Sequence, residues 1–238
     1  VDGLQKCGLL PADWDLGWKR IINDGNASED TDLIRKWSRY SHYFNPHHKI
    51  DQRREDSSVT IRESVAEIAA DPKDELGMMR LVGRIVHHVQ DAAVPAHVIP
   101  VNHFADDGFE KMDISQFYTE PQRIEDCGDL APGEPDALLQ QTALATLANL
   151  RGAVSFSVEG FHKNKAWLDS FWTLSRDNGF GSYGSLGNSF GAEEFSLEDG
   201  RTVRVPRDQY DWFKRFQVAL AVRATQNAIL WANRLRGL

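Results

Sequence analysis

Histidine and aspartate residues gather in one short window of the sequence, HHVQDAAVPAHVIPVNHFADDGFE at residues 87–110. His87 and Asp91 stand four residues apart, so on a helix their side chains lie on one face. An imidazole nitrogen and a carboxylate oxygen at that spacing can bind one metal ion at about 2.0–2.2 Å. His88 lies about a quarter turn away, and we expect it not to share the site. The pair predicts a metal site built from histidine and carboxylate ligands.

A second group of the same residue types follows in the same window. His97 comes after Pro95, which breaks the preceding helix and redirects the chain. His103 and Asp107 repeat the four-residue spacing, and Glu110 falls on their face if that segment is helical. A lone histidine is most often a core or surface residue, but two such pairs in 24 residues are much less often a coincidence. The window therefore offers four histidines and several carboxylates on two or three aligned faces.

The composition limits which classes of protein fit this window. Of 238 residues, 41% are hydrophobic and 26% charged, which is ordinary for a folded globular protein. The net charge of −8 argues against a protein that wraps nucleic acid by neutralising phosphates, although bound cations can supply positive charge locally. No apolar run reaches the length of about 18 residues that spans a bilayer. The two cysteines, Cys7 and Cys127, are too few for a cysteine zinc site, and in an oxidising compartment they could form one disulfide.

Apolar residues at helical spacing predict the elements that position these side chains. The predicted helices cover residues 29–44, 57–70, 74–93, 136–156 and 208–236. Asn45-Pro46 marks the end of the first of these helices, and Pro95 marks the end of the third.

The last predicted helix carries one core face, which includes Phe213, Phe216 and Trp231, and we expect Trp212 to be buried as well. Ahead of it lies a glycine-rich stretch, followed by Asp199-Gly200 between alternating residues, which suggests a small hairpin. Because nothing resembles a linker, we predict a single all-α domain over residues 1–238. Its metal cluster lies between helices, and a glycine-rich loop and hairpin insertion lies near residues 179–205.

The segment GRIVHHVQDAAVPAH resembles zinc-dependent phospholipase C, and equally the secreted single-strand-specific zinc nucleases that share its fold. YSHYFNP at residues 40–46 resembles the family segment in which a lone histidine ligand precedes an aromatic residue and a proline. Asp30 stands near the position of a metal-binding aspartate, and RATQNAILWANRL is similar to the closing helix. The resemblance covers most of the chain, with specific motifs between residues 30 and 110.

The resemblance implies a first zinc held by Asp30, His42, His87 and Asp91, with Glu29 and Asp32 as rivals of Asp30. It implies a second zinc held by His97, His103 and Asp107, with Glu110 as a neighbour of that ion or an alternate ligand. The family's third zinc uses a mature N-terminal tryptophan and a histidine about a dozen residues later. This chain begins with Val1 and has no histidine before His42, so we expect two zinc ions, and a third if such ligands lie upstream.

Zinc ions suit the hydrolysis of phosphate esters because they neutralise phosphate oxygens and lower the pKa of a bound water. The resemblance thus implies a phosphodiester hydrolase of the phospholipase C type, in which Asp30 also orients or deprotonates the attacking water. The expected substrate is a phospholipid headgroup or a nucleic acid, and the expected location is secreted or periplasmic. We expect no stable protein partner.

Three functional hypotheses stay open at this point. A phospholipase would touch a membrane surface transiently through Phe180, Tyr183, Leu186 and Phe190, although a flexible connector is the simpler interpretation of that loop. A single-strand nuclease of the same fold would need aromatic platforms for unstacked bases. The third hypothesis is a zinc-binding protein that lost the third metal site and does not catalyse.

Overall fold

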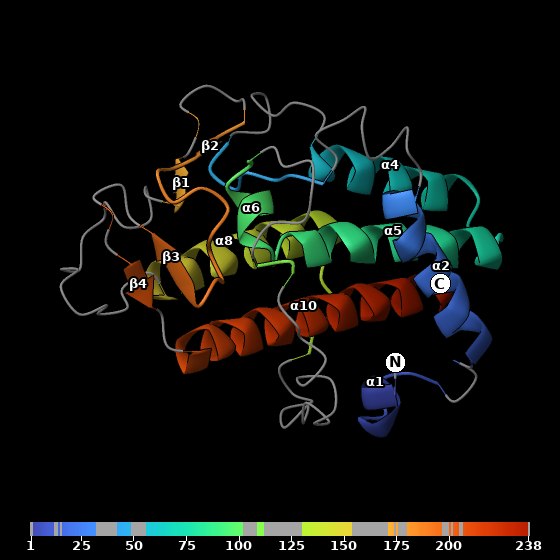
Figure 1. The fold of residues 1–238 in the computed structure, drawn as a ribbon. Helices are drawn as coiled ribbons and strands as arrows, with labels where there is room; N and C mark the ends of the chain where they lie inside the picture. The colour runs from blue at the N-terminus through green and yellow to red at the C-terminus, as the bar shows by residue number, and fades with distance from the viewer. Residues whose placement is uncertain are drawn as a thin grey trace.

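The computed structural model describes residues 2–11, 14, 16–31, 42–48, 56–101, 109–111, 130–153, 171–173, 175, 180–196, 200, 202–204 and 207–237. In these residues the protein is a bundle of helices, which confirms the predicted all-α class (Figure 1). Short strands lie at one end of the bundle. Helices α1 (Asp2–Lys6) and α2 (Leu16–Thr31) lie at the other, beside the C-terminal end of α10 (Arg207–Arg236).

Helix α5 (Glu75–Asp91) is the central element of the bundle. The Asp74 side chain caps its first turn by accepting a hydrogen bond from the backbone N–H of Gly77. α5 packs against α2, α4 (Ser57–Ala70), α8 (Pro135–Ala153) and α10. Since other helices cover several of its sides, even the polar residues of its last turns, His87 and His88, are buried.

Four of the five predicted helices are confirmed within the described residues: α4, α5, α8 and α10. The predicted hairpin is also confirmed. Strand β3 (Glu194–Ser196) pairs antiparallel with β4 (Thr202–Arg204), and Gly200 in the connection has a φ of +81°, which favours glycine. A second antiparallel pair joins β1 (Trp172–Thr173) to β2 (Ser182–Tyr183).

The predicted helix over residues 29–44 is wrong at both of its ends, which are the parts of it that the structure describes. The helix of that region is α2, which ends at Thr31, and residues 42–45 are not helical; residues 32–41 lie outside the described residues. The sequence LGWKRIINDGNASEDT contains two glycines, two asparagines and two aspartates, which favour a helix only weakly. Packing against α5 stabilises α2 instead.

Several expected core residues are exposed. Trp212 and Phe216 of α10 are 46% and 47% exposed and contact one another with tilted rings, whereas Trp231 is buried as expected. In the glycine-rich loop, Leu186 and Phe190 are buried in the core, whereas Phe180 and Tyr183 are only partly buried.

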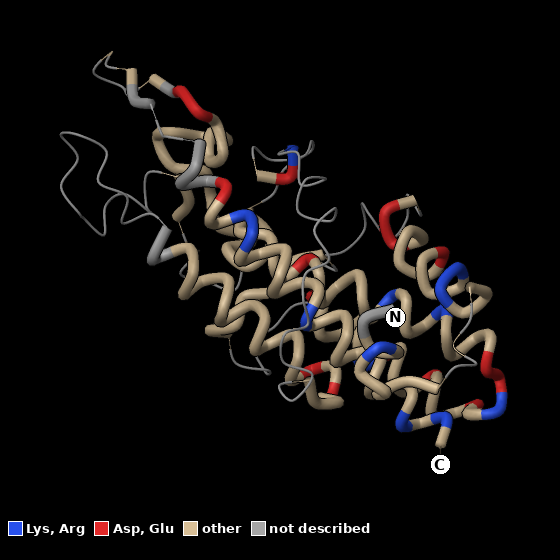
Figure 2. Tube along the Cα trace, turned by 90° about the horizontal axis from the view of Figure 1, so that it is seen from below, with Lys and Arg blue, Asp and Glu red and all other residues tan. Residues whose placement is uncertain are grey.

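Phe190 packs among the core rings of Trp172 and Phe213. None of the described helices is long and apolar enough to cross a membrane. Basic and acidic residues are mixed along the described helices (Figure 2).

Helices α2 and α5 cross unusually closely, at a pair of glycines. A Cβ atom on Gly83 would lie 2.2 Å from the carbonyl oxygen of Ile22, and one on Gly25 would lie 2.2 Å from the carbonyl oxygen of Arg80. Each helix therefore meets the backbone of the other, which is possible only without side chains at both positions. This crossing determines how closely the end of α2 approaches the last turns of α5.

We predict that Gly83→Ala destabilises the protein by about 1–3 kcal/mol, because the new methyl group must push α2 away from α5. Urea denaturation followed by circular dichroism measures the change in the free energy of unfolding. Gly237→Ala is the matched control, since its Cβ would meet only ordinary contacts at 3.6 Å or more. Equal stability of the Gly83 variant and the wild type would contradict the close crossing.

Candidate metal centre

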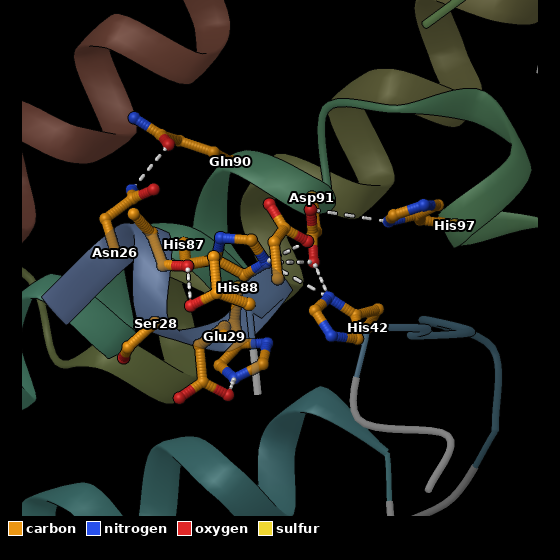
Figure 3. A network of polar contacts seen from close by, with 12 residues as sticks. Asn26, Ser28, Glu29, His42, His87, His88, Gln90, Asp91 and His97 are labelled. Carbon is orange, nitrogen blue, oxygen red and sulfur yellow. Dashed lines mark hydrogen bonds and ion pairs between the residues drawn. The ribbon is translucent and has the colours of Figure 1, made fainter. Parts of the chain in front are cut away.

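The carboxylate of Asp91, in the last turn of α5, lies at the centre of a group of imidazoles (Figure 3). Its Oδ2 lies 2.9 Å from His42 Nδ1 and 3.3 Å from His87 Nε2, and these two nitrogens are 3.0 Å apart. His87 and Asp91 share one face of α5, as predicted from their spacing, and His42 enters from the non-helical segment that precedes α4. All three side chains are largely shielded from solvent.

Asp30, in the last turn of α2, joins this group from the solvent side. Its Oδ1 lies 3.8 Å from His87 Nε2, and its side chain is 58% exposed. Asp30, His42 and His87 each offer one ligand atom, and these atoms lie within 4.8 Å of one another. The structure thus brings together all four residues that the resemblance implies for the first zinc.

The distances in this group fit one tetrahedral zinc ion. Ligand atoms at about 2.0–2.1 Å from a tetrahedral zinc are about 3.3 Å from one another. The three pairwise distances among His42 Nδ1, His87 Nε2 and Asp91 Oδ2 are 2.9, 3.0 and 3.3 Å. Two imidazoles and carboxylates are also a donor set that zinc accepts. The residues present therefore fit the metal that the sequence predicts.

His97 lies beside this group on α6 (Pro95–Val98), a short helix that begins at the predicted helix-breaking proline. Its Nδ1 lies 3.5 Å from Asp91 Oδ1, and its Nε2 lies 3.2 Å from Glu110 Oε1. The backbone N–H of Phe44 donates to the His97 carbonyl at 2.9 Å, which ties the His42 segment to α6.

Two buried hydrogen bonds hold the turn between α5 and α6. Thr146 of α8 donates to the carbonyl of Ala92 at 2.7 Å, and Gln217 of α10 donates to the carbonyl of Ala93 at 3.0 Å. These bonds satisfy carbonyls at the end of α5 that have no partner within the helix. They fix the turn that carries the chain from Asp91 to His97.

The structure tests only part of the predicted second zinc site. His103 and Asp107 lie outside the described residues, so their predicted roles stay predictions. Glu110, which the sequence analysis treated as a neighbour or alternate ligand, is the described carboxylate next to His97 Nε2.

The charges of the cluster are coupled. Burial by itself raises the pKa of Asp91, but the nearby charges of His87 and His97 and the hydrogen bonds from His42 and His87 hold that pKa well below its usual value. For His97 the effects are reversed: burial lowers its pKa, but the carboxylates of Asp91 and Glu110 outweigh burial and raise the pKa to about 10. The site therefore favours positive charge, and a bound cation would compete with the protons on the histidine rings.

His88 behaves differently from the prediction. It was expected not to share the site, but a ring nitrogen of His88 lies within 4.8 Å of ligand atoms on His42 and Asp91. The reason is helical periodicity, because positions 88 and 91 are three residues apart and so are also neighbours on the helix surface. The spacing of His88 and Asp91 was a signal for this contact that the prediction overlooked.

Glu29, a sequence-based rival of Asp30, is instead part of a buried ion pair. Its side chain is 1% exposed; Arg84 Nε donates to its Oε1 at 2.6 Å, and its Oε2 lies 3.4 Å from His88 Nε2. Adjacent residues of α2 therefore have separate surroundings, Asp30 facing the cluster and Glu29 facing α5. Asp32, the other rival, lies outside the described residues.

Cys7 is disulfide-bonded in the structure. Cys127, the other cysteine of the sequence, lies outside the described residues.

Comparison with protein-family models, with curated proteins and with solved structures found no match.

We predict that the Glu29 ion pair makes stability fall in acid. Burial raises the pKa of Glu29, but the hydrogen bonds and charges of His88 and Arg84 outweigh it and lower the pKa from 4.5 to about 2. Because the folded pKa lies below the unfolded one, the contribution is complete above pH 4.5 and is lost as the pH falls towards 2. It amounts to no more than about 3 kcal/mol.

The measurement is the free energy of unfolding of the wild type and of Glu29→Gln between pH 7 and pH 2. The difference between the two proteins should shrink as the pH falls through this window. A difference that is constant with pH would contradict the assigned ion pair.

Proposed function

We propose that the protein is a zinc-dependent phosphodiester hydrolase. The observation that carries the proposal is the convergence of His42 Nδ1, His87 Nε2 and Asp91 Oδ2 at mutual distances of 3.3 Å or less. Such a buried group of two imidazoles and one carboxylate is costly unless a cation or shared protons compensate it. The sequence resemblance to zinc-dependent phospholipase C and the related nucleases supplies the reaction class.

A zinc ion, when bound, would offset the charge of a phosphate and lower the pKa of a water molecule. His42, His87 and Asp91 would hold the ion, since their ligand atoms are the ones that converge. Asp30 would complete the set from the solvent side, because its carboxylate is exposed and lies 3.8 Å from His87 Nε2. The same exposure suits Asp30 to orient an attacking water and accept its proton.

A second zinc is proposed at His97, with Glu110 as one ligand. The support for it is that both ring nitrogens of His97 face carboxylates, Nδ1 towards Asp91 and Nε2 towards Glu110. Asp91 would then act on both ions through its two oxygens. Two neighbouring cations suit a phosphodiester because they can neutralise the attacking and leaving oxygens together.

One observation favours the single-strand nuclease as the second candidate. The ring of Tyr43 lies 5.2 Å from that of His97 and 4.9 Å from that of Phe180, and both aromatic residues are only partly buried. Aromatic surfaces beside a phosphate-binding centre can stack on unpaired bases.

We predict at least one tightly bound zinc per chain in protein purified without a chelator, and two when the His97 site is filled. Elemental analysis by mass spectrometry measures the ratio. His87→Ala should remove the first zinc, because His87 Nε2 faces His42, Asp91 and Asp30. The control is His47→Ala, an exposed histidine outside the cluster. Wild-type protein with less than one transition metal per chain would overturn the proposal.

We predict hydrolysis of bis-p-nitrophenyl phosphate that a chelator abolishes and zinc restores. Asp30→Asn should lower the rate by about 10²-fold or more, because its amide cannot accept the proton of the attacking water. The matched control is Asp24→Asn, an exposed aspartate on the same helix. Equal rates for the two variants would contradict the role of Asp30.

Phospholipid vesicles and single-stranded DNA, tested side by side, distinguish the substrates. Cleavage of lipid alone would select the phospholipase, and cleavage of DNA alone the nuclease. Zinc-replete protein that is inactive on bis-p-nitrophenyl phosphate, on vesicles and on DNA would favour the hypothesis of a non-catalytic zinc-binding protein.

A further inference from the structure

His42 Nε2 and His88 Nδ1, two buried imidazole nitrogens next to the candidate metal centre, have no hydrogen-bond partner within the described residues. Buried polar groups are nearly always paired, so two neighbouring exceptions need a common explanation. The rings of His42 and His88 lie 5.7 Å apart between centroids. Figure 3 shows His88 between Glu29 and His42.

The orientation of His42 decides which of its nitrogens carries hydrogen when a metal is bound. Nδ1 faces the cluster, 2.9 Å from Asp91 Oδ2 and 3.0 Å from His87 Nε2. A nitrogen that binds a metal ion must be unprotonated, so the hydrogen of a neutral His42 then sits on Nε2. Metal-binding histidines almost always donate this hydrogen to a neighbouring acceptor, which fixes the ring.

The surroundings of His88 decide its own tautomer. The side chain is fully buried, and Nε2 lies 3.4 Å from Glu29 Oε2. Glu29 is held in place by Arg84, which donates to its other oxygen at 2.6 Å. An ionised carboxylate can only accept hydrogen bonds, so it favours the tautomer of His88 with hydrogen on Nε2. Nδ1 of His88 is then left as an acceptor.

We propose that His88 is a positioning residue for the metal centre, accepting at Nδ1 the hydrogen bond from His42 Nε2 while Glu29 holds its tautomer. A ring nitrogen of His42 lies within 4.8 Å of a ring nitrogen of His88, and the proposed hydrogen bond requires the rings to turn until Nε2 and Nδ1 face one another. The resulting chain runs from Arg84 through Glu29 and His88 to His42, and it gives both unpaired nitrogens a partner. This inference rests on metal binding by His42 as proposed above and not on hydrolysis.

The first test reads the tautomers in the wild-type protein. Long-range nitrogen–proton NMR correlations of histidine rings distinguish Nδ1–H from Nε2–H. We expect His88 as the Nε2–H tautomer with and without zinc, and His42 as Nε2–H once zinc is added. Hydrogen on Nδ1 of His88 would overturn the proposal.

The second test measures zinc affinity by competition with a chromophoric chelator. His88→Phe keeps a buried ring without nitrogens. Glu29→Gln keeps the shape but presents an amide N–H₂ to His88 Nε2, which should move the hydrogen of His88 to Nδ1. Both variants should weaken zinc binding about 10–100-fold without changing the stoichiometry.

The control variant is Asn26→Ala. Asn26 Nδ2 donates to Gln90 Oε1 at 2.9 Å, so it also joins α2 to α5 but lies outside the proposed chain. Unchanged zinc affinity in this variant, with loss in the other two, supports the proposal. Equal losses in all three would assign the effect to helix packing and overturn it, as would an unchanged affinity of Glu29→Gln.

The remaining outcomes separate this inference from the proposed function. If His88→Phe lowers the number of bound zinc ions, His88 is itself a ligand, and the positioning role is wrong while zinc binding stands. Wild-type protein that binds no zinc would overturn both.

Discussion

The buried carboxylate of Asp91 is the interaction on which the rest of the site depends. One oxygen faces His42 and His87 and the other faces His97, so three imidazoles from two helices and a loop converge on a single side chain. A buried anion of this kind is stable only when positive charge surrounds it. The low pKa of Asp91 reflects the nearby charges of His87 and His97 and the hydrogen bonds from His42 and His87, which outweigh the effect of burial. The turn after α5 and its hydrogen bonds from α8 and α10 hold the arrangement in place.

The close crossing of α2 and α5 is the packing feature that completes the site. With no side chains at Gly25 and Gly83, the two helices approach backbone to backbone. The last turn of α2 then places two neighbouring acidic residues in different surroundings. Glu29 is buried against Arg84 and His88, whereas Asp30 stays exposed beside His87. The buried ion pair anchors the helix, and the carboxylate of Asp30 faces solvent.

Much of this arrangement could be predicted from the sequence, because local patterns determine it. The apolar spacing of α5 and the four-residue spacing of His87 and Asp91 depend only on helix geometry. The position of α2 in the sequence could not be predicted in the same way. This helix is stabilised by its crossing with α5 at two glycines, which is a contact between distant parts of the chain. The burial of His88 and the exposure of Trp212 likewise depend on which helices cover each face. Residue types alone do not determine which helices cover a given face.

The most direct test of the central claim is the anomalous scattering of a zinc-loaded crystal, measured on both sides of the zinc absorption edge. The claim predicts a strong peak bounded by His42 Nδ1, His87 Nε2 and Asp91 Oδ2, with Asp30 turned towards it. Absence of a peak at this position, or a zinc ion bound only elsewhere, would contradict it.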